Sequence, residues 1–237
     1  MRFLLAFLLI YPAHAIVWRA DLRTLPTAQM AEMKQVGKVF YSPLKVFGGS
    51  CYALGGRWVL TCRHGTDKWS ASMLKVQFPA LGKEILEIQG IVFPAHGDFA
   101  LLELAKPLKS AKAPVLFVGK ATPNQRAWLG GFGKSGPVGQ LDGNGEFHAG
   151  HNRVDGIRNN KVSLTLGQPD DPSTEPDEAS LAIFDSGSPL FLEVEGKWRL
   201  AGIASTASNG SNPGYGDRAN YARISTVVGW IRKLTGE

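Results

Sequence analysis

The chain has 237 residues, of which 44% are hydrophobic and 19% charged, and its formal net charge is +6. These values exclude a disordered chain, a coiled coil and a collagen-like fibre, and the length suits one large domain or two small lobes. The basic residues are dispersed, without interleaved aromatic residues, so we expect no nucleic acid partner. The 28 glycines and 14 prolines indicate many turns, which favours short strands over long helices.

The first 15 residues are typical of a signal peptide. Arg2 supplies a positive charge, an apolar run follows from Phe3 to Tyr11, and Ala13-His14-Ala15 is a small-x-small cleavage site. The apolar run is too short to span a bilayer. We expect residues 1–15 to be removed and the mature chain to be secreted or periplasmic, with no membrane association after cleavage. The alternative is a buried strand or helix at the start of the fold.

Two cysteines, Cys51 and Cys62, flank a predicted β-hairpin whose turn contains Gly55-Gly56. The midpoint between their positions falls within that turn, so in paired antiparallel strands they would face each other within bonding reach. An exported chain also meets oxidising conditions. We therefore predict a Cys51–Cys62 disulfide, and the alternative is two free, buried cysteines.

Short segments with strand character recur along the chain, separated by turn residues. Several alternate apolar and polar side chains, which is typical of antiparallel strands with one buried face. Their spacing favours barrels or a sandwich. The segments are Arg57–Thr61, Lys75–Phe78, Ile88–Phe93, Phe99–Leu104, Val115–Val118, Ala127–Phe132, Val162–Leu166, Leu190–Val194, Trp198–Ser205 and Asn220–Ile224.

One helix is predicted, at the C-terminus. Apolar residues from Ile224 to Leu234 recur at helical spacing and form one face, with Ser225 as the N-cap.

No metal-ligand pattern is complete. We interpret the acidic segment 169–178 as a solvated loop, and His148 and His151 lack further ligand residues nearby. We therefore expect neither a metal nor a cofactor.

Three segments contain the residue types of a nucleophilic triad. His64 follows a strand-like segment, Asp98 precedes an apolar strand, and Ser186 lies in the tight turn Asp185-Ser186-Gly187. A serine hydroxyl becomes a good nucleophile when a base removes its proton, and neutral imidazole suits that role near pH 7. A carboxylate fixes the imidazole tautomer and stabilises the imidazolium. The order His, Asp, Ser therefore suggests nucleophilic catalysis.

These segments resemble those of the chymotrypsin/trypsin-like serine proteases, in particular secreted, bacterial-type members. The family typically contains T-A-A-H-C, D-I-A-L-L and G-D-S-G-G-P-L, and this chain has T-C-R-H-G at 61–65, D-F-A-L-L at 98–102 and F-D-S-G-S-P-L at 184–190. Further segments that resemble the family are 49–54, 131–133, 200–205 and 221–231. The resemblance extends along most of the mature chain.

The resemblance implies an all-β fold of two antiparallel six-stranded β-barrels with a C-terminal α-helix. The protease domain would span 16–237, with lobe one at about 16–118, lobe two at about 119–221 and the helix at about 225–235. The implied function is a secreted serine endopeptidase that hydrolyses peptide bonds through an acyl-enzyme intermediate. We expect a monomer that acts on protein or peptide substrates.

Residue by residue, the resemblance makes His64 the general base and acid, Asp98 the residue that orients it, and Ser186 the nucleophile. The backbone N–H groups of Phe184 and Ser186 would form the oxyanion hole. Residues expected to bind the substrate are Ser180 at the base of the specificity pocket, and Ser205, Thr206 and Ala207 beside it.

Some positions depart from the family pattern. Gly65 stands where a cysteine is usual, Ser188 replaces a glycine, and Ser180 is not the acid that confers Lys/Arg specificity. Phe184 replaces the glycine of the oxyanion segment, where the backbone conformation can be costly for other residues. Either its N–H points inward with the ring over the cleft, or the peptide is flipped. The alternative function is therefore a catalytically inactive protease homologue acting as a binding protein.

Relatives of this fold often activate by releasing an Ile-Val N-terminus whose ammonium pairs with the aspartate beside the serine. Cleavage after Ala15 would expose Ile16-Val17, with Asp185 as the partner. The alternative is that Ile16 has no such role, because the usual Ile-Val-Gly-Gly continues here as Ile16-Val17-Trp18-Arg19 and the stretch to Gly49 is long.

Overall fold

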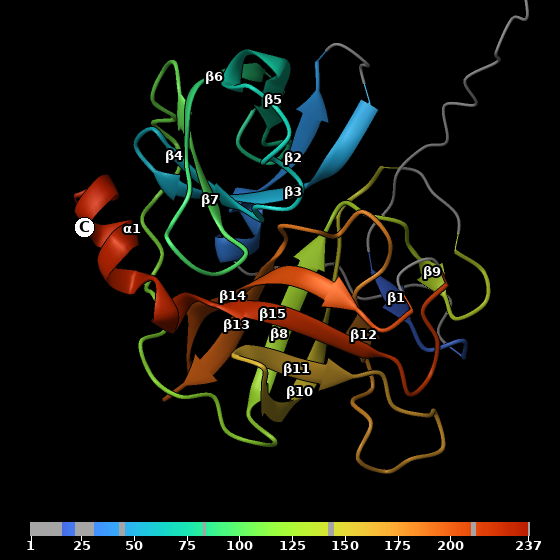
Figure 1. The fold of residues 1–237 in the computed structure, drawn as a ribbon. Coiled ribbons are helices and arrows are strands. Elements are labelled where there is room, and N and C mark those ends of the chain that lie inside the picture. The colour runs from blue at the N-terminus through green and yellow to red at the C-terminus, as the bar shows by residue number, and fades with distance from the viewer. Residues whose placement is uncertain are drawn as a thin grey trace, which may run out of the picture.

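The computed structural model describes residues 16–21, 31–42, 46–82, 84–141, 145–209 and 212–236. The predicted signal peptide, residues 1–15, lies outside these described residues. The described chain forms two closed barrels of six antiparallel strands each, with α1 (Val228–Thr235) beside them (Figure 1). This architecture confirms the two-barrel fold expected from the resemblance.

The first barrel contains strands between residues 36 and 104, preceded by the short 3-10 helix η1 (Ala31–Gln35). Its interior is filled by apolar side chains that alternate along the strands, among them Val39, Val59 and Leu102. In spatial order its strands are β2 (Val36–Tyr41), β3 (Val46–Gly55), β4 (Trp58–Thr61), β7 (Ala100–Leu104), β6 (Ile85–Val92) and β5 (Leu74–Gln77), and the 3-10 helix η2 (Ala71–Met73) precedes β5.

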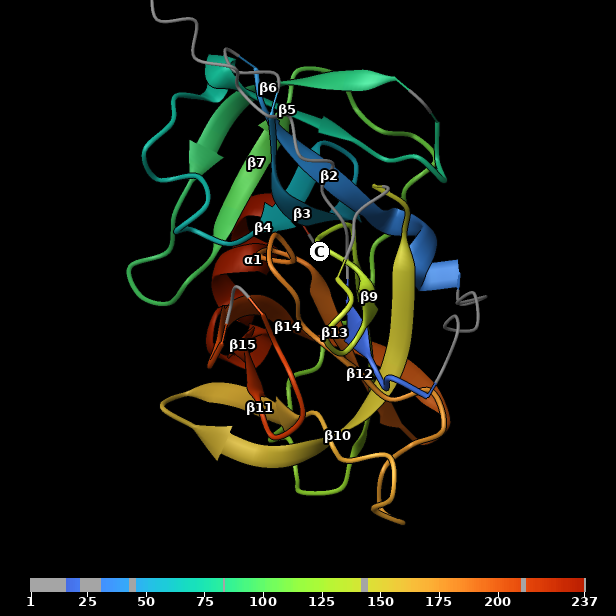
Figure 2. The ribbon, with the colours of Figure 1, turned by 90° about the vertical axis from the view of Figure 1, so that its right-hand side faces the viewer.

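The second barrel contains strands between residues 126 and 223 and has its own apolar interior, which includes Leu129, Leu164 and Tyr221. Beside it lies a small three-stranded sheet (Figure 2). Its central strand contains Val17 and Trp18, from the first described segment of the chain. The barrel order is β10 (His148–Arg158), β11 (Lys161–Thr165), β15 (Arg218–Arg223), β14 (Lys197–Ala207), β13 (Pro189–Val194) and β8 (Arg126–Gly131), and the small sheet is β12 (Ala179–Ser180), β1 (Val17–Trp18) and β9 (Gly136–Pro137).

A third apolar cluster joins the two barrels. It contains Tyr52 and Leu60 from the first barrel, and Phe191 and Ile203 from the second. The rings of Tyr52 and Phe191 meet edge to face, 5.5 Å apart. These residues point out of their own barrels. The outer faces of the two barrels therefore bury each other in this cluster.

The C-terminal helix begins later than predicted. Residues Ile224–Thr226 form the 3-10 helix η3, and α1 starts at Val228 with Val227 as its N-cap, which provides no side-chain cap. Ile231 anchors α1 in the cluster between the barrels. Within the described ranges, no helix is long and apolar enough to cross a bilayer.

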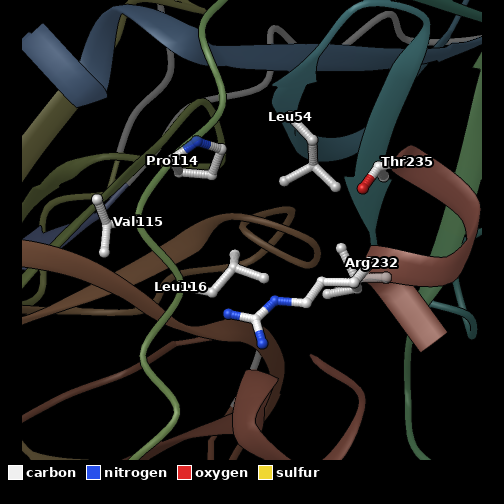
Figure 3. Close-up of a pocket in the computed structure, with 7 residues that line it drawn as sticks. Leu54, Pro114, Val115, Leu116, Arg232 and Thr235 are labelled. Atoms are coloured by element: carbon white, nitrogen blue, oxygen red, sulfur yellow. The ribbon is translucent and has the colours of Figure 1, made fainter. Parts of the chain in front are cut away.

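The segment that connects the barrels is not the strand predicted at Val115–Val118. Leu116 forms a single bridge with Leu200. A cavity of about 180 Å³ lies where this segment faces α1. Figure 3 shows the side chains that line it. Its lining residues are Leu54, Pro114, Val115, Leu116, Ile231, Arg232 and Thr235.

The predicted disulfide is wrong, because Cys51 and Cys62 are free and buried. Strands β3 and β4 do pair as a hairpin, with Tyr52 opposite Leu60. A β-bulge next to the turn, between Ala53 and Gly55, shifts the register by one residue from the symmetry that the prediction assumed.

This one-residue shift places the two cysteines on opposite faces of the sheet. Cys51 packs inside the first barrel with Val59, whereas Cys62 packs in the cluster between the barrels with Leu60. Each thiol therefore contributes to a different part of the core.

We predict that the protein, purified without reductant, yields two alkylatable thiols once it is unfolded. In the folded protein alkylation is slow, because burial raises the pKa of the Cys51 thiol and the thiolate is the reactive form. Mass spectrometry after iodoacetamide treatment, with and without denaturant, measures both states. Unfolded protein that takes up no alkyl group until it is reduced would contradict the register described above.

Candidate functional site

His64 and Asp98 come from neighbouring strands of the first barrel. His64 lies just beyond the end of β4, and Asp98 lies just before the start of β7. These strands pair with Thr61 opposite Ala100, so both residues emerge at the same edge of the barrel. Ser186 lies in the turn before β13 of the second barrel. The three residues therefore come together only because the barrels meet.

The three side chains form a continuous series of hydrogen bonds. Asp98 Oδ2 lies 2.7 Å from His64 Nδ1, and His64 Nε2 lies 2.9 Å from Ser186 Oγ. The backbone N–H of His64 also donates to Asp98 Oδ1 at 2.9 Å. Asp98 therefore holds both the backbone and the ring of His64, with Nε2 directed to the serine hydroxyl.

Ser205 makes a contact that the sequence analysis missed. Its hydroxyl, on β14 of the second barrel, donates to Asp98 Oδ2 at 2.5 Å. The sequence analysis placed Ser205 only beside the substrate, since a contact between residues 107 positions apart leaves no local motif. Cys62 is a second missed neighbour, with its Sγ 3.7 Å from His64 Nε2.

These contacts shift the pKa values of the pair in opposite directions. Burial by itself would raise the pKa of Asp98, but hydrogen bonds from His64 and Ser205 outweigh it and lower the pKa to about 2. The hydrogen bond to Asp98, and then that to Cys62, raise the pKa of His64 to about 10. Asp98 thus stays ionised, and its contacts favour the imidazolium that forms when His64 accepts a proton.

A buried carboxylate holds the turn that carries Ser186. Asp185 is fully buried and accepts hydrogen bonds from the backbone N–H groups of Ile16 at 2.9 Å, Ala182 at 2.9 Å and Gly133 at 3.0 Å. Burial raises the pKa of Asp185 to about 7, although these donors favour the ionised form. Two distant segments, together with its own turn, are therefore bound to the residue next to Ser186.

The same turn is also bound through its backbone. The carbonyl of Ser186 accepts from the N–H of Ser50 in the first barrel at 2.8 Å, and the N–H of Gly187 donates to Ala204. Within the described part of the chain, the N–H groups of Phe184 and Ser186 donate to no acceptor. These are the two groups that the sequence analysis assigned to the oxyanion hole.

Phe184 adopts a backbone conformation that favours glycine. Its φ is +70°, in the left-handed region, where a side chain costs about 1–2 kcal/mol. Its side chain is 38% exposed, and its ring meets that of Phe47 edge to face at 6.2 Å. Phe47 in turn meets Phe40 at the same distance. The ring of Phe184 therefore leans towards the first barrel.

A cavity of about 310 Å³ lies beside Ser186. None of the described residues that line it is charged, so it suits an uncharged side chain. Ser205, Thr206 and Ala207 line it in the region that the sequence analysis expected. Ser180 does not line it, because Ser180 lies in β12, buried and paired with Val17. The lining residues are Leu181, Ala182, Ile183, Phe184, Ser186, Ala204, Ser205, Thr206 and Ala207.

No family model matches the chain. Its fold is similar to that of neuropsin, a serine protease expressed in the limbic system of mouse brain, with a TM-score of 0.66 and 16% sequence identity. The similarity covers 87% of this chain and 97% of that one. The chain therefore has the chymotrypsin/trypsin-like fold.

The strain at Phe184 predicts an unusual order of stability. Phe184→Gly and Phe184→Ala both remove the ring, but only glycine adopts a φ of +70° without strain. We expect the glycine variant to be the more stable by about 1 kcal/mol in the free energy of unfolding, measured with urea.

Val118 provides the matched control, because it is exposed and its φ is not positive. At Val118 we expect alanine to be more stable than glycine by about 0.4–1 kcal/mol, since glycine adds freedom to the unfolded chain. If alanine were more stable than glycine at both positions, the backbone of Phe184 would not be strained.

Proposed function

We propose that the chain is a serine endopeptidase that cleaves peptide bonds through an acyl-enzyme intermediate. The observation that carries this proposal is the unbroken series from Asp98 through His64 to Ser186, with distances of 2.7 and 2.9 Å. This alignment favours an enzyme over a binding protein without catalytic activity, because it places the serine hydroxyl where the imidazole can remove its proton.

In the first half of the reaction, Ser186 Oγ attacks the substrate carbonyl carbon while His64 Nε2 takes its proton. The carbonyl oxygen becomes an oxyanion, which the N–H groups of Phe184 and Ser186 stabilise. Asp98 stabilises the imidazolium. Nε2 then gives the proton to the amine as the C–N bond breaks, which leaves an acyl group on Ser186.

In the second half, water takes the place of the amine. His64 removes a proton from the water, whose oxygen attacks the acyl carbon, and the same N–H groups stabilise the second oxyanion. The proton returns to Ser186 Oγ as the ester bond breaks, which releases the acid and restores the enzyme.

The cavity beside Ser186 favours an apolar side chain on the acyl side of the cleaved bond. The described residues of its lining carry no charge that could pair with a Lys, Arg, Asp or Glu side chain of the substrate, and burying an unpaired charge is costly. The preferred residue is therefore uncharged. The exposed ring of Phe184 adds apolar surface next to this cavity.

We also propose that the active form begins at Ile16 after removal of residues 1–15 during export. The nitrogen of Ile16 already lies 2.9 Å from Asp185 Oδ2, and both residues are fully buried. As an ammonium it would neutralise a carboxylate whose pKa burial raises to about 7.

The backbone of Ile16 supports the same proposal. Its φ is +70°, an outlier for a β-branched residue in an intact chain. A chain that begins at Ile16 has no peptide bond before this residue, so cleavage after Ala15 would remove the restriction on φ. No separate activating protease is then needed.

We predict that Ser186→Ala lowers hydrolysis of a peptide library by about 10⁴–10⁶-fold, because the nucleophile is lost. The unfolding transition stays unchanged, and a fluorophosphonate no longer labels the protein. Ser188→Ala is the matched control: its hydroxyl lies in the same turn, is buried, and has no hydrogen-bond partner within the described chain. Ser188→Ala should keep both activity and labelling. A folded Ser186→Ala protein with a tenth of the natural activity would rule out this mechanism.

A second prediction concerns the N-terminus. Two residues added before Ile16 should abolish activity, because an amide cannot supply the charge that Asp185 needs in this buried site. The same two residues added after Glu237 serve as the control. The measurement is the rate of peptide hydrolysis by the two extended proteins, with each N-terminus verified by mass spectrometry. An unchanged rate in the N-terminally extended protein would exclude the role of Ile16 but leave the triad intact.

A further inference from the structure

A larger cavity, of about 680 Å³, lies where η1 and β2 of the first barrel face the segment before β10. Its volume is within the range of small-molecule sites, roughly 300–1,000 Å³. It includes none of the residues proposed for catalysis. The lining residues are Met33, Lys34, Val36, Lys38, Pro79, Ala80, Phe132, Gly145, Glu146 and Phe147.

Most of the cavity wall is apolar. Met33, Val36 and Phe132 are buried, and the ring of Phe147 packs on that of Phe132 with centroids 5.4 Å apart. These side chains come from both barrels, so they do not move with one short loop. They form a surface suited to the aromatic or aliphatic body of a ligand.

Lys38 adds a positive charge to this apolar wall. Its ammonium donates to the carbonyl of Gly145 at 2.6 Å and lies 4.8 Å from the centre of the Phe132 ring. Burial lowers the pKa of Lys38, which shows that its charge is only partly solvated. No carboxylate of the described residues forms an ion pair with it, and an ammonium has three protons to donate.

The other charged groups at the cavity leave an excess of positive charge. Lys34 lines it as a second cation, and Glu146, which is exposed, is the one acid among the lining residues that the structure describes. An anionic group on a ligand would therefore complete the hydrogen bonds of Lys38 and balance the charge.

We propose that this cavity binds a small amphipathic carboxylate, an acid with an aryl or short alkyl body. The carboxylate accepts hydrogen bonds from Lys38, and the apolar body lies against Met33, Val36 and Phe147. Phe132 precedes Gly133, whose N–H donates to Asp185, so the site adjoins the segment that supports Ser186. The proposal nevertheless stands independently of the proposed protease activity, since binding is measured directly.

The test uses the natural chain with its methionine methyl groups labelled with ¹³C and observed by NMR. The probes are 3-phenylpropionate and its neutral analogue 3-phenylpropanamide. We expect the acid to shift the Met33 methyl signal saturably, and the amide to bind about tenfold more weakly because it lacks the charge. Met73, in η2 and outside the cavity, is the internal control and should not shift.

Two lysine variants distinguish binding at this site from nonspecific attraction of an anion to a positively charged protein. Lys38→Met keeps the length of the side chain and should weaken the acid about tenfold while leaving the amide unchanged. Lys75→Met, which removes a lysine outside the cavity that pairs with Glu87, should alter neither probe. Equal affinity of the natural chain for acid and amide, no saturable shift at Met33 at millimolar acid, or full retention of acid binding in Lys38→Met would each overturn the proposal.

Discussion

The buried carboxylate of Asp185 links the turn that contains Ser186 to two segments far from it in the sequence. It sits next to Ser186 and accepts N–H groups from the start of the chain, from the end of β8 and from its own turn. A carboxylate without solvent keeps its charge only while such donors surround it. The position of Ser186 is therefore coupled to Ile16 and Gly133, which lie far from it in sequence. This coupling explains how an event at the N-terminus could control a turn more than 160 residues away.

The two barrels contribute complementary halves of one site. The first supplies His64 and Asp98, and the second supplies Ser186 together with the hydroxyl of Ser205. Besides the hydrogen bond between His64 and Ser186, others cross between the barrels here, among them those from Ser205 to Asp98 and from the N–H of Ser50 to the carbonyl of Ser186. The apolar cluster around Tyr52 and Phe191 holds the two barrels in the relative position that these hydrogen bonds require. A small sliding of one barrel would break the series, because hydrogen bonds weaken steeply with angle and distance.

Phe184 shows how a site can tolerate a residue that its backbone disfavours. Its conformation leaves two N–H groups beside Ser186 without acceptors in the described chain, which is the arrangement an oxyanion needs. The ring gains an edge-to-face contact with Phe47, worth about 0.5–1.5 kcal/mol, which offsets part of the strain. The substitution therefore changes the surface around the site more than the donors within it.

Local patterns in the sequence were sufficient for much of this protein. Alternating apolar residues indicated the strands, and the segments around His64, Asp98 and Ser186 indicated both the fold and the three side chains that the barrels bring together. Such patterns are local, so they do not reveal burial or contacts that depend on how the strands pair. Strand β10 was not predicted, since its polar residues, such as His151 and Asn152, become buried only by pairing and packing. The bulge in β3 was equally invisible, and it alone separates Cys51 from Cys62. The hydroxyl of Ser205 on Asp98 and the cavity at Lys38 join residues distant in sequence, and the sequence left the pairing of Ile16 with Asp185 open. These features are determined by the tertiary structure alone, because the free energy of such contacts depends on which surfaces meet when the barrels close.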